Sequence, residues 1–174
     1  MQLAASAPER VRRLILVSPA NPFARAYHRI VKFHLSGPGG IFIRFAPFAP
    51  VPIWEYAIRR MCGEITRLPA DIGLGYRQPL REAGMTAHIR SSLKTLVADT
   101  QALGESLRHL SKIPTLLIWG DRDPVVELDS GRQLQRALAA EMAIMPGVGH
   151  LPYEERPEEF SRIVLEFLRN RVIG

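Results

Sequence analysis

The chain has 174 residues, 47% of them hydrophobic and 23% charged, which is typical of one soluble globular domain with room for a small insertion. The net charge of +6 would suit a nucleic-acid binder, but the arginines are scattered and form no continuous basic run, so we expect no nucleic-acid partner. No apolar run approaches the roughly 18 residues that span a bilayer, no signal peptide is recognisable, and the single cysteine, Cys62, cannot form an internal disulfide. These features predict a cytoplasmic protein without a membrane span.

The first twenty residues predict the end of a helix followed by a buried strand. Residues 1–7 are typical of a helix that Pro8 closes, because residues before a proline avoid the helical region. The apolar run at residues 14–17 lies between two arginines and Ser18-Pro19. A short continuous apolar run of this kind predicts a strand that is covered on both faces, as in a parallel sheet.

The middle of the chain, residues 21–109, differs from both ends in composition and in the spacing of its apolar residues. It is rich in proline and glycine, and turn-like stretches separate three segments with helical spacing of apolar residues. These amphipathic segments are residues 23–35, 53–61 and 85–103. The pattern predicts an irregular, mostly helical insertion.

Regular alternation returns after residue 110. Thr115 to Trp119 predict a buried strand, and a helix capped by Asp129 or Ser130 follows. Residues 141–147 predict a third strand, and Pro157 predicts the start of a last helix. Strand, helix, strand and helix with short links indicate an α/β fold with an incomplete parallel sheet of about three strands.

Two polar turns follow the last two expected strands. "GDRDP" at residues 120–124 offers Asp121 or Asp123, and "PGVGH" at residues 146–150 offers His150. Ligands of open parallel sheets bind beyond the carboxyl ends of the strands. We therefore expect one carboxylate and the imidazole to meet there, where a carboxylate can orient histidine as a general base.

The same stretches resemble the C-terminal half of an α/β-hydrolase. The resemblance is carried by "IPTLLIWGDRDPVV", by "MPGVGHLPYEERPEEFSRIVLEFL", and by "PERVRRLILVSPA", which is similar to the segment after the nucleophile helix. It implies that residues 1–20 and 110–174 form part of the hydrolase core and that residues 21–109 form a cap, or lid. It also assigns the catalytic acid to Asp123 and the base to His150, and it leaves Asp121 as a surface carboxylate.

The third member of the expected triad is missing. The family places its nucleophile in a G-x-S-x-G elbow, and no serine of this chain stands in that frame. Ser18 follows a strand but has no neighbouring glycine, so we interpret it as structural, and Cys62 lies in the insertion without an elbow. We expect the nucleophile to precede Met1. The isolated chain should then be inactive, and the strand at residues 14–17 should have an unpaired edge.

Two classes of function remain open at this point. One is a serine hydrolase that acts on a small apolar acyl or ester substrate, or a dehalogenase or epoxide hydrolase if the missing nucleophile is an aspartate. The other is an inactive fragment, or a subunit completed by a separate N-terminal chain. We expect no cofactor and no metal site, because no His, Cys or Asp cluster has ligand spacing. Four aromatic residues could line a pocket or simply pack: Phe23, Phe45, Trp54 and Tyr76.

Overall fold

The computed structural model describes residues 1–63 and 68–169, without the side chains of residues 26, 27, 105 and 109. Its three strands form one parallel sheet in the order β1-β2-β3. The bounds are Leu14–Val17 for β1, Thr115–Gly120 for β2 and Glu141–Met145 for β3. The α/β class and the parallel sheet of three strands that the sequence predicts are therefore confirmed.

The central strand, β2, holds the two halves of the core together. All six of its residues are buried. Because successive side chains point to opposite faces, Leu117 packs with Leu107 and Leu134 on one face, while Leu116 and Ile118 pack on the other. Each buried side chain of this kind contributes about 1.5–3 kcal/mol of hydrophobic stabilisation.

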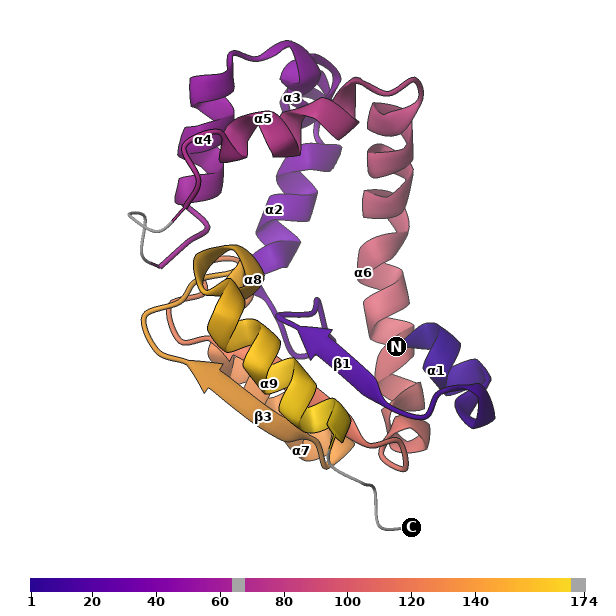
Figure 1. Ribbon diagram of the computed structural model, residues 1–174. Helices are drawn as coiled ribbons and strands as arrows, with labels where there is room; N and C mark the ends of the chain where they lie inside the picture. Colours follow the sequence, from indigo (N-terminus) through magenta and orange to yellow (C-terminus); the bar gives the residue numbers. More distant parts are fainter. Residues whose placement is uncertain (64–67, 170–174) are drawn as a thin grey trace.

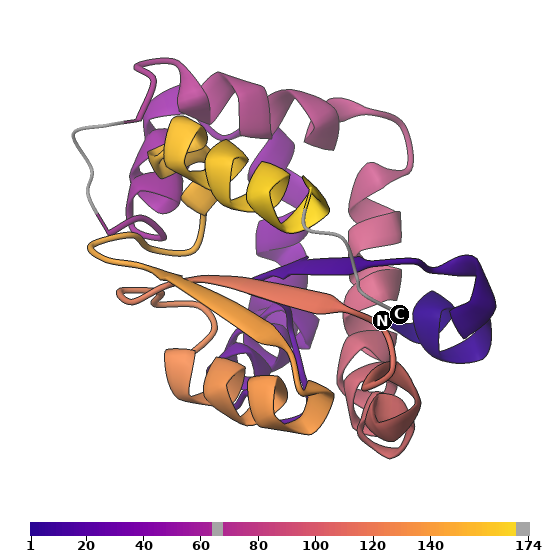
Figure 2. The same ribbon diagram turned by 60° about the horizontal axis from the view of Figure 1, so that its bottom comes forward.

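Helices cover both faces of the sheet. Figure 2 shows α9 (Pro157–Arg169) on one side of the strands and α7 (Leu128–Leu138) on the other. Phe167 of α9 belongs to the same buried cluster as Leu116 and Ile118. The start of α9 at Pro157 agrees with the sequence, whereas the short helix α8 (Pro152–Glu155) before it was not expected.

The expected cap of α7 is wrong by two or three residues. The N-cap is Glu127, and the residues proposed from sequence lie inside the first turn of the helix. Ser130 is fully buried there. Its hydroxyl donates to the carbonyl of Glu127 at 2.7 Å and accepts from the Asn21 amide at 3.2 Å. The serine therefore joins α7 to the loop after β1, a tertiary use that local capping rules cannot reveal.

A group of helices separates β1 from β2. Most of them lie beyond the carboxyl ends of the strands, and the last one, residues 85–110, runs from there back alongside the sheet (Figure 1). The three expected amphipathic segments are all helical, and further short helices connect them. Within the described ranges, no helix has both the length and the apolar character needed to cross a membrane. The elements are α2 (Ala26–Leu35), α3 (Gly37–Phe45), η2 (Ala46–Phe48), α4 (Val51–Arg59), α5 (Ile72–Arg77), η4 (Gln78–Arg81) and α6 (Met85–Leu110), and α1 (Gln2–Ser6) and η1 (Pro8–Arg10) precede β1.

Candidate active site

The two residues that the sequence selects, Asp123 and His150, lie in contact. Asp123 Oδ2 is 2.8 Å from His150 Nδ1. The residues follow β2 and β3, which pair in parallel, so both turns lie at the same edge of the sheet. The Asp123 side chain has no solvent exposure, whereas the His150 side chain is 20% exposed. The carboxylate is thus shielded while the ring remains accessible.

Backbone groups hold the Asp123 carboxylate in place. Its Oδ1 accepts hydrogen bonds from the N–H groups of Val125 at 2.8 Å and Val126 at 3.0 Å. Aspartate commonly bonds to the backbone two or three residues ahead in turns of this kind. With Oδ1 occupied by the turn, Oδ2 faces His150. One carboxylate therefore shapes its own loop and orients the imidazole.

The hydrogen bond to Asp123 also sets the protonation pattern of His150. An ionised carboxylate can only accept a hydrogen bond, so Nδ1 carries the proton and its N–H donates a hydrogen bond to Asp123. In the neutral ring the lone pair then lies on Nε2, the nitrogen on the far side of the imidazole. This is the arrangement of a general base held by an acid.

The loop before His150 lies directly against the helical insertion. The His150 N–H donates to the carbonyl of Met61 at 2.7 Å. A Cβ on Gly149 would come within 2.4 Å of that carbonyl oxygen, so only glycine fits there. Gly147 has a φ of 75°, which glycine adopts without strain. The two glycines therefore let the loop turn and approach the insertion closely.

Asp121, the competing acid, has a different position. It is exposed, and its Oδ1 accepts the Gly147 N–H at 2.7 Å. The turns after β2 and β3 are joined a second time by the Arg122 N–H, which donates to the carbonyl of Val148 at 2.9 Å. These bonds fix the two turns relative to each other.

Ser18 directly follows β1 and has an unusual backbone conformation. Its φ is 38°, in the left-handed region, although the residue is not glycine. It is 4% exposed, and its Oγ has no hydrogen-bond partner among the described residues. Ser18 therefore adopts a left-handed conformation although neither of its neighbours is glycine.

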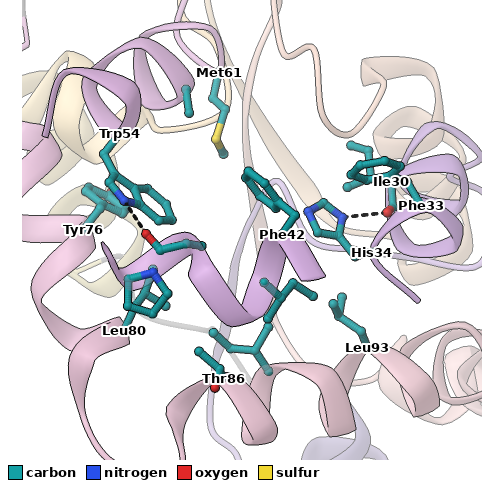
Figure 3. Close-up of a pocket in the computed structure, with 15 residues that line it drawn as sticks. Ile30, Phe33, His34, Phe42, Trp54, Met61, Tyr76, Leu80, Thr86 and Leu93 are labelled. Atoms are coloured by element: carbon teal, nitrogen blue, oxygen red, sulfur yellow. Dashed lines mark hydrogen bonds between the residues drawn. The ribbon is translucent and has the colours of Figure 1, made fainter. Parts of the chain in front are cut away.

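A cavity of about 670 Å³ opens among the helices of the insertion (Figure 3). None of its described lining residues is Lys, Arg, Asp or Glu. The Trp54 indole N–H donates to the carbonyl of Ala46 at 3.0 Å, and His34 Nδ1 lies 2.7 Å from the carbonyl oxygen of Ile30. The lining consists of Ile30, Phe33, His34, Phe42, Ile43, Ala46, Pro47, Trp54, Ala57, Met61, Tyr76, Leu80, Thr86, Ile89 and Leu93.

Three polar side chains of the cavity wall, those of Trp54, His34 and Tyr76, contact hydrogen-bond partners within the protein. The Tyr76 hydroxyl donates to Glu154 at 3.2 Å, and burial raises the pKa of Tyr76 far above its ordinary value. Of the four candidate pocket aromatics, Trp54 and Tyr76 line the cavity, whereas Phe45 is 59% exposed and Phe23 packs against a core cluster. The wall therefore offers mainly apolar contact.

Met61 connects the cavity to the histidine. Its side chain lines the cavity, and in Figure 3 it extends from the end of the α4 segment toward Phe42. Its carbonyl accepts the His150 N–H. Sequence patterns do not predict this contact, because the two residues are far apart in the chain.

Among the described residues, the other candidate groups do not form a second site. No group of three or more His, Cys, Asp or Glu side chains suitable for a metal occurs among the described residues. Burial, followed by the nearby charge of Glu155, raises the pKa of the Cys62 thiol to about 12, which disfavours the reactive thiolate. The position of His109 at the exit of the insertion predicts a surface or packed ring, and its side chain lies outside the described residues.

Comparison with known proteins agrees with this architecture. A model of the alpha/beta hydrolase family matches residues 1–163. A 2-hydroxy-6-oxononadienedioate/2-hydroxy-6-oxononatrienedioate hydrolase from Paraburkholderia xenovorans is 36% identical over 84 residues, which are 47% of this chain and 29% of that protein. The chain therefore belongs to the alpha/beta hydrolase family.

Solved structures share the fold over nearly the whole chain. The 2-hydroxy-6-oxo-6-phenylhexa-2,4-dienoate hydrolase from Rhodococcus sp. strain RHA1 matches 97% of this chain with a TM-score of 0.70 and 20% identity. A bacterial membrane phospholipase A matches 96% with a TM-score of 0.69 and 25% identity. This chain covers 59% and 52% of those two chains, so it spans little more than half of their length.

Proposed function

We propose that this chain carries the acid and the base of a serine-type hydrolase that cleaves esters or similar acyl bonds. The observation that supports the proposal is the 2.8 Å contact between the shielded Asp123 carboxylate and the accessible His150 ring. Membership of the alpha/beta hydrolase family supports hydrolysis as the reaction class. A complete triad would also need a nucleophile, and no serine of this sequence stands in the elbow frame.

The proposed roles follow from the proton positions. His150 Nε2 takes the proton of a hydroxyl nucleophile and later returns it to the leaving group. Asp123 holds the ring and stabilises the imidazolium that forms. In this proposal the nucleophile comes from a segment outside the 174 residues, because no serine here has the elbow sequence.

The helical insertion, residues 21–109, serves as the cap in this proposal. Its apolar cavity suits a small apolar acyl or ester substrate, because an apolar wall without fixed charges favours an uncharged ligand. The two structural relatives are named for different substrates, a dienoate and a phospholipid, so the fold alone does not select one.

The test compares the 174-residue chain with the longer product translated from the codons upstream of Met1. With a chromogenic short-chain ester, we expect turnover from the longer product only, falling at least ~10³-fold in its His150→Ala variant. Labelling by a fluorophosphonate would identify a serine nucleophile and distinguish it from an aspartate. Turnover by the longer product that survives His150→Ala would contradict the proposal.

A second candidate is a subunit completed by a separate N-terminal chain. The feature that favours it is the free edge of β1, which pairs only with β2 in the described part of the chain. If upstream codons contain no elbow, this candidate predicts that a separately encoded N-terminal half co-purifies with the chain. Esterase activity should then require both polypeptides.

A further inference from the structure

Glu155 is a buried carboxylate to which the proposed mechanism gives no role. The residue is only 2% exposed and lies at the end of α8, five residues after His150. A buried ionised carboxylate is costly unless hydrogen bonds compensate for the lost water. The identity of its partners therefore indicates what it does.

Its two oxygens bind two different parts of the molecule. Oε1 accepts the N–H of Gly149 at 2.8 Å, and Oε2 accepts the N–H of Gly63 at 2.8 Å. Gly149 precedes His150 in the loop after β3, whereas Gly63 follows α4 in the helical insertion. One side chain thus bridges the histidine loop and the insertion.

The two bridged backbones are in direct contact. A Cβ on Gly63 would lie 2.2 Å from the carbonyl oxygen of Gly147, and a Cβ on Gly149 would lie 2.5 Å from the Gly63 nitrogen. The His150 N–H bond to Met61 lies at the same junction. Three hydrogen bonds and two glycine contacts therefore fix this loop against residues 61–63.

Apolar packing and charge support the same junction. Leu151 is 4% exposed and packs in one cluster with Ile58 and Ile72 of the insertion. Burial, and then the nearby charge of Glu155, raise the pKa of the Cys62 thiol, so this carboxylate lies beside residue 62 as well as residue 63. Charge-assisted bonds from backbone N–H groups to such a carboxylate are stronger than neutral ones.

We infer that Glu155 is a positioning residue that sets the His150 ring relative to the insertion by binding Gly149 and Gly63 together. The inference rests on the proposed role of His150 as the base. Without the bridge, the loop can move away from Met61, and the ring loses the orientation in which Nδ1 faces Asp123. The insertion and the base are consequently coupled through one side chain.

The test uses the 174-residue chain labelled with ¹⁵N, so it requires no turnover. In the unsubstituted protein, the amides of Gly63 and Gly149 should both be protected from hydrogen exchange, and the His150 ring shifts should report a proton on Nδ1. In Glu155→Gln, one N–H must face the amide NH₂ group, which cannot accept. We expect exchange at both glycines to become at least ~10-fold faster and the ring to populate both tautomers.

Glu158→Gln is the matched control, because Glu158 is an exposed glutamate in the first turn of α9. It should leave exchange and ring shifts unchanged. A folded Glu155→Gln protein with unchanged ring shifts would overturn the inference, since a merely structural role would alter stability alone. If that variant does not fold, absence of protection at Gly63 and Gly149 in the unsubstituted chain would overturn it instead.

The same spectra separate this inference from the proposed function. If the ring of the unsubstituted protein shows no proton on Nδ1, the Asp123–His150 pair fails, whatever the glycine amides do. If the Nδ1 signal is present and insensitive to Glu155→Gln, the pair stands and the positioning role fails.

Discussion

At the scale of single residues, Asp123 has two separable tasks. Oδ1 accepts two backbone N–H groups that close its turn, and Oδ2 accepts from His150. A substitution that keeps an oxygen at Oδ1 should preserve the turn even when the carboxylate is lost. The site therefore allows stability and ring orientation to be tested independently.

We expect the free energy of unfolding of Asp123→Asn to lie within ~0.5 kcal/mol of that of the unsubstituted chain. The His150 tautomer should nevertheless change, because an amide NH₂ group would face Nδ1. Asp123→Ala should lose the turn bonds as well and be less stable by about 1–2 kcal/mol. Urea denaturation measures the stability, and ¹⁵N shifts of the ring measure the tautomer. Equal destabilisation by both variants would show that the two tasks are not separable.

Cys62 provides a second test at this scale. Its pKa of about 12 lies well above the ordinary 9.0, so the thiolate fraction at pH 8 should be about a thousandfold lower than for a free thiol. Alkylation by iodoacetamide should be at least ~100-fold slower in the folded chain than in guanidinium. Because the pKa is raised, the folded-state rate should still climb about tenfold per pH unit from pH 8 to pH 10. Similar rates for the folded and unfolded chains would contradict the assigned burial.

At the scale of elements, the loop after β3 closely approaches the segment that follows α4. Gly149 does not have a positive φ, so the constraint on it is space and not backbone conformation. Gly75 in α5 differs, because a Cβ there would meet nothing within 4 Å. Alanine substitutions at Gly149 and at Gly75 therefore separate the effect of a steric contact from the effect of adding a methyl group.

Gly149→Ala should destabilise the chain by about 1–3 kcal/mol, because its Cβ would lie 2.4 Å from the Met61 oxygen and force the loop away from the insertion. Gly75→Ala should instead be neutral or stabilise by up to about 1 kcal/mol, since alanine favours helix more than glycine. Thermal and urea unfolding of both variants check this. A Gly149→Ala protein as stable as the original would mean that the close contact does not persist in solution.

The cavity among the insertion helices gives a second prediction at this scale. A neutral aliphatic ester should displace the fluorophore N-phenyl-1-naphthylamine at least ~10-fold better than the carboxylate anion of equal chain length, because the described wall supplies no cation. Ala57→Trp should fill the cavity and weaken both probes at least ~10-fold. Ile53→Trp, on the same helix but 52% exposed and outside the lining, should not change binding. Equal affinity for ester and anion would contradict an apolar site.

At the scale of the whole molecule, local patterns in the sequence predicted the sheet and the pair. The apolar runs of β1 and β2 are continuous and indicate strands, and their alternation with α7 and α9 indicates that the strands are parallel. Parallel strands place the turns that carry Asp123 and His150 at one edge of the sheet. The hydrogen bond between Glu155 and Gly63 could not be predicted in this way, because it joins residues that are 92 positions apart. Such contacts depend on how the insertion packs, and no local pattern encodes that.

The free edge of β1 and the net charge of +6 act in opposite directions on self-association. Leu14 and Ser18 donate toward β2, so strand alternation directs the Ile15 and Val17 N–H groups to the open edge, where another strand can pair. Repulsion between positively charged copies is screened by salt.

Sedimentation velocity should therefore show self-association that strengthens between ~0.02 and ~0.5 M salt. In Val17→Lys, the association should be at least ~10-fold weaker. Ile144→Lys, on the opposite edge strand β3, is the control and should have little effect. Association that weakens with salt would indicate charge pairing and contradict the edge mechanism.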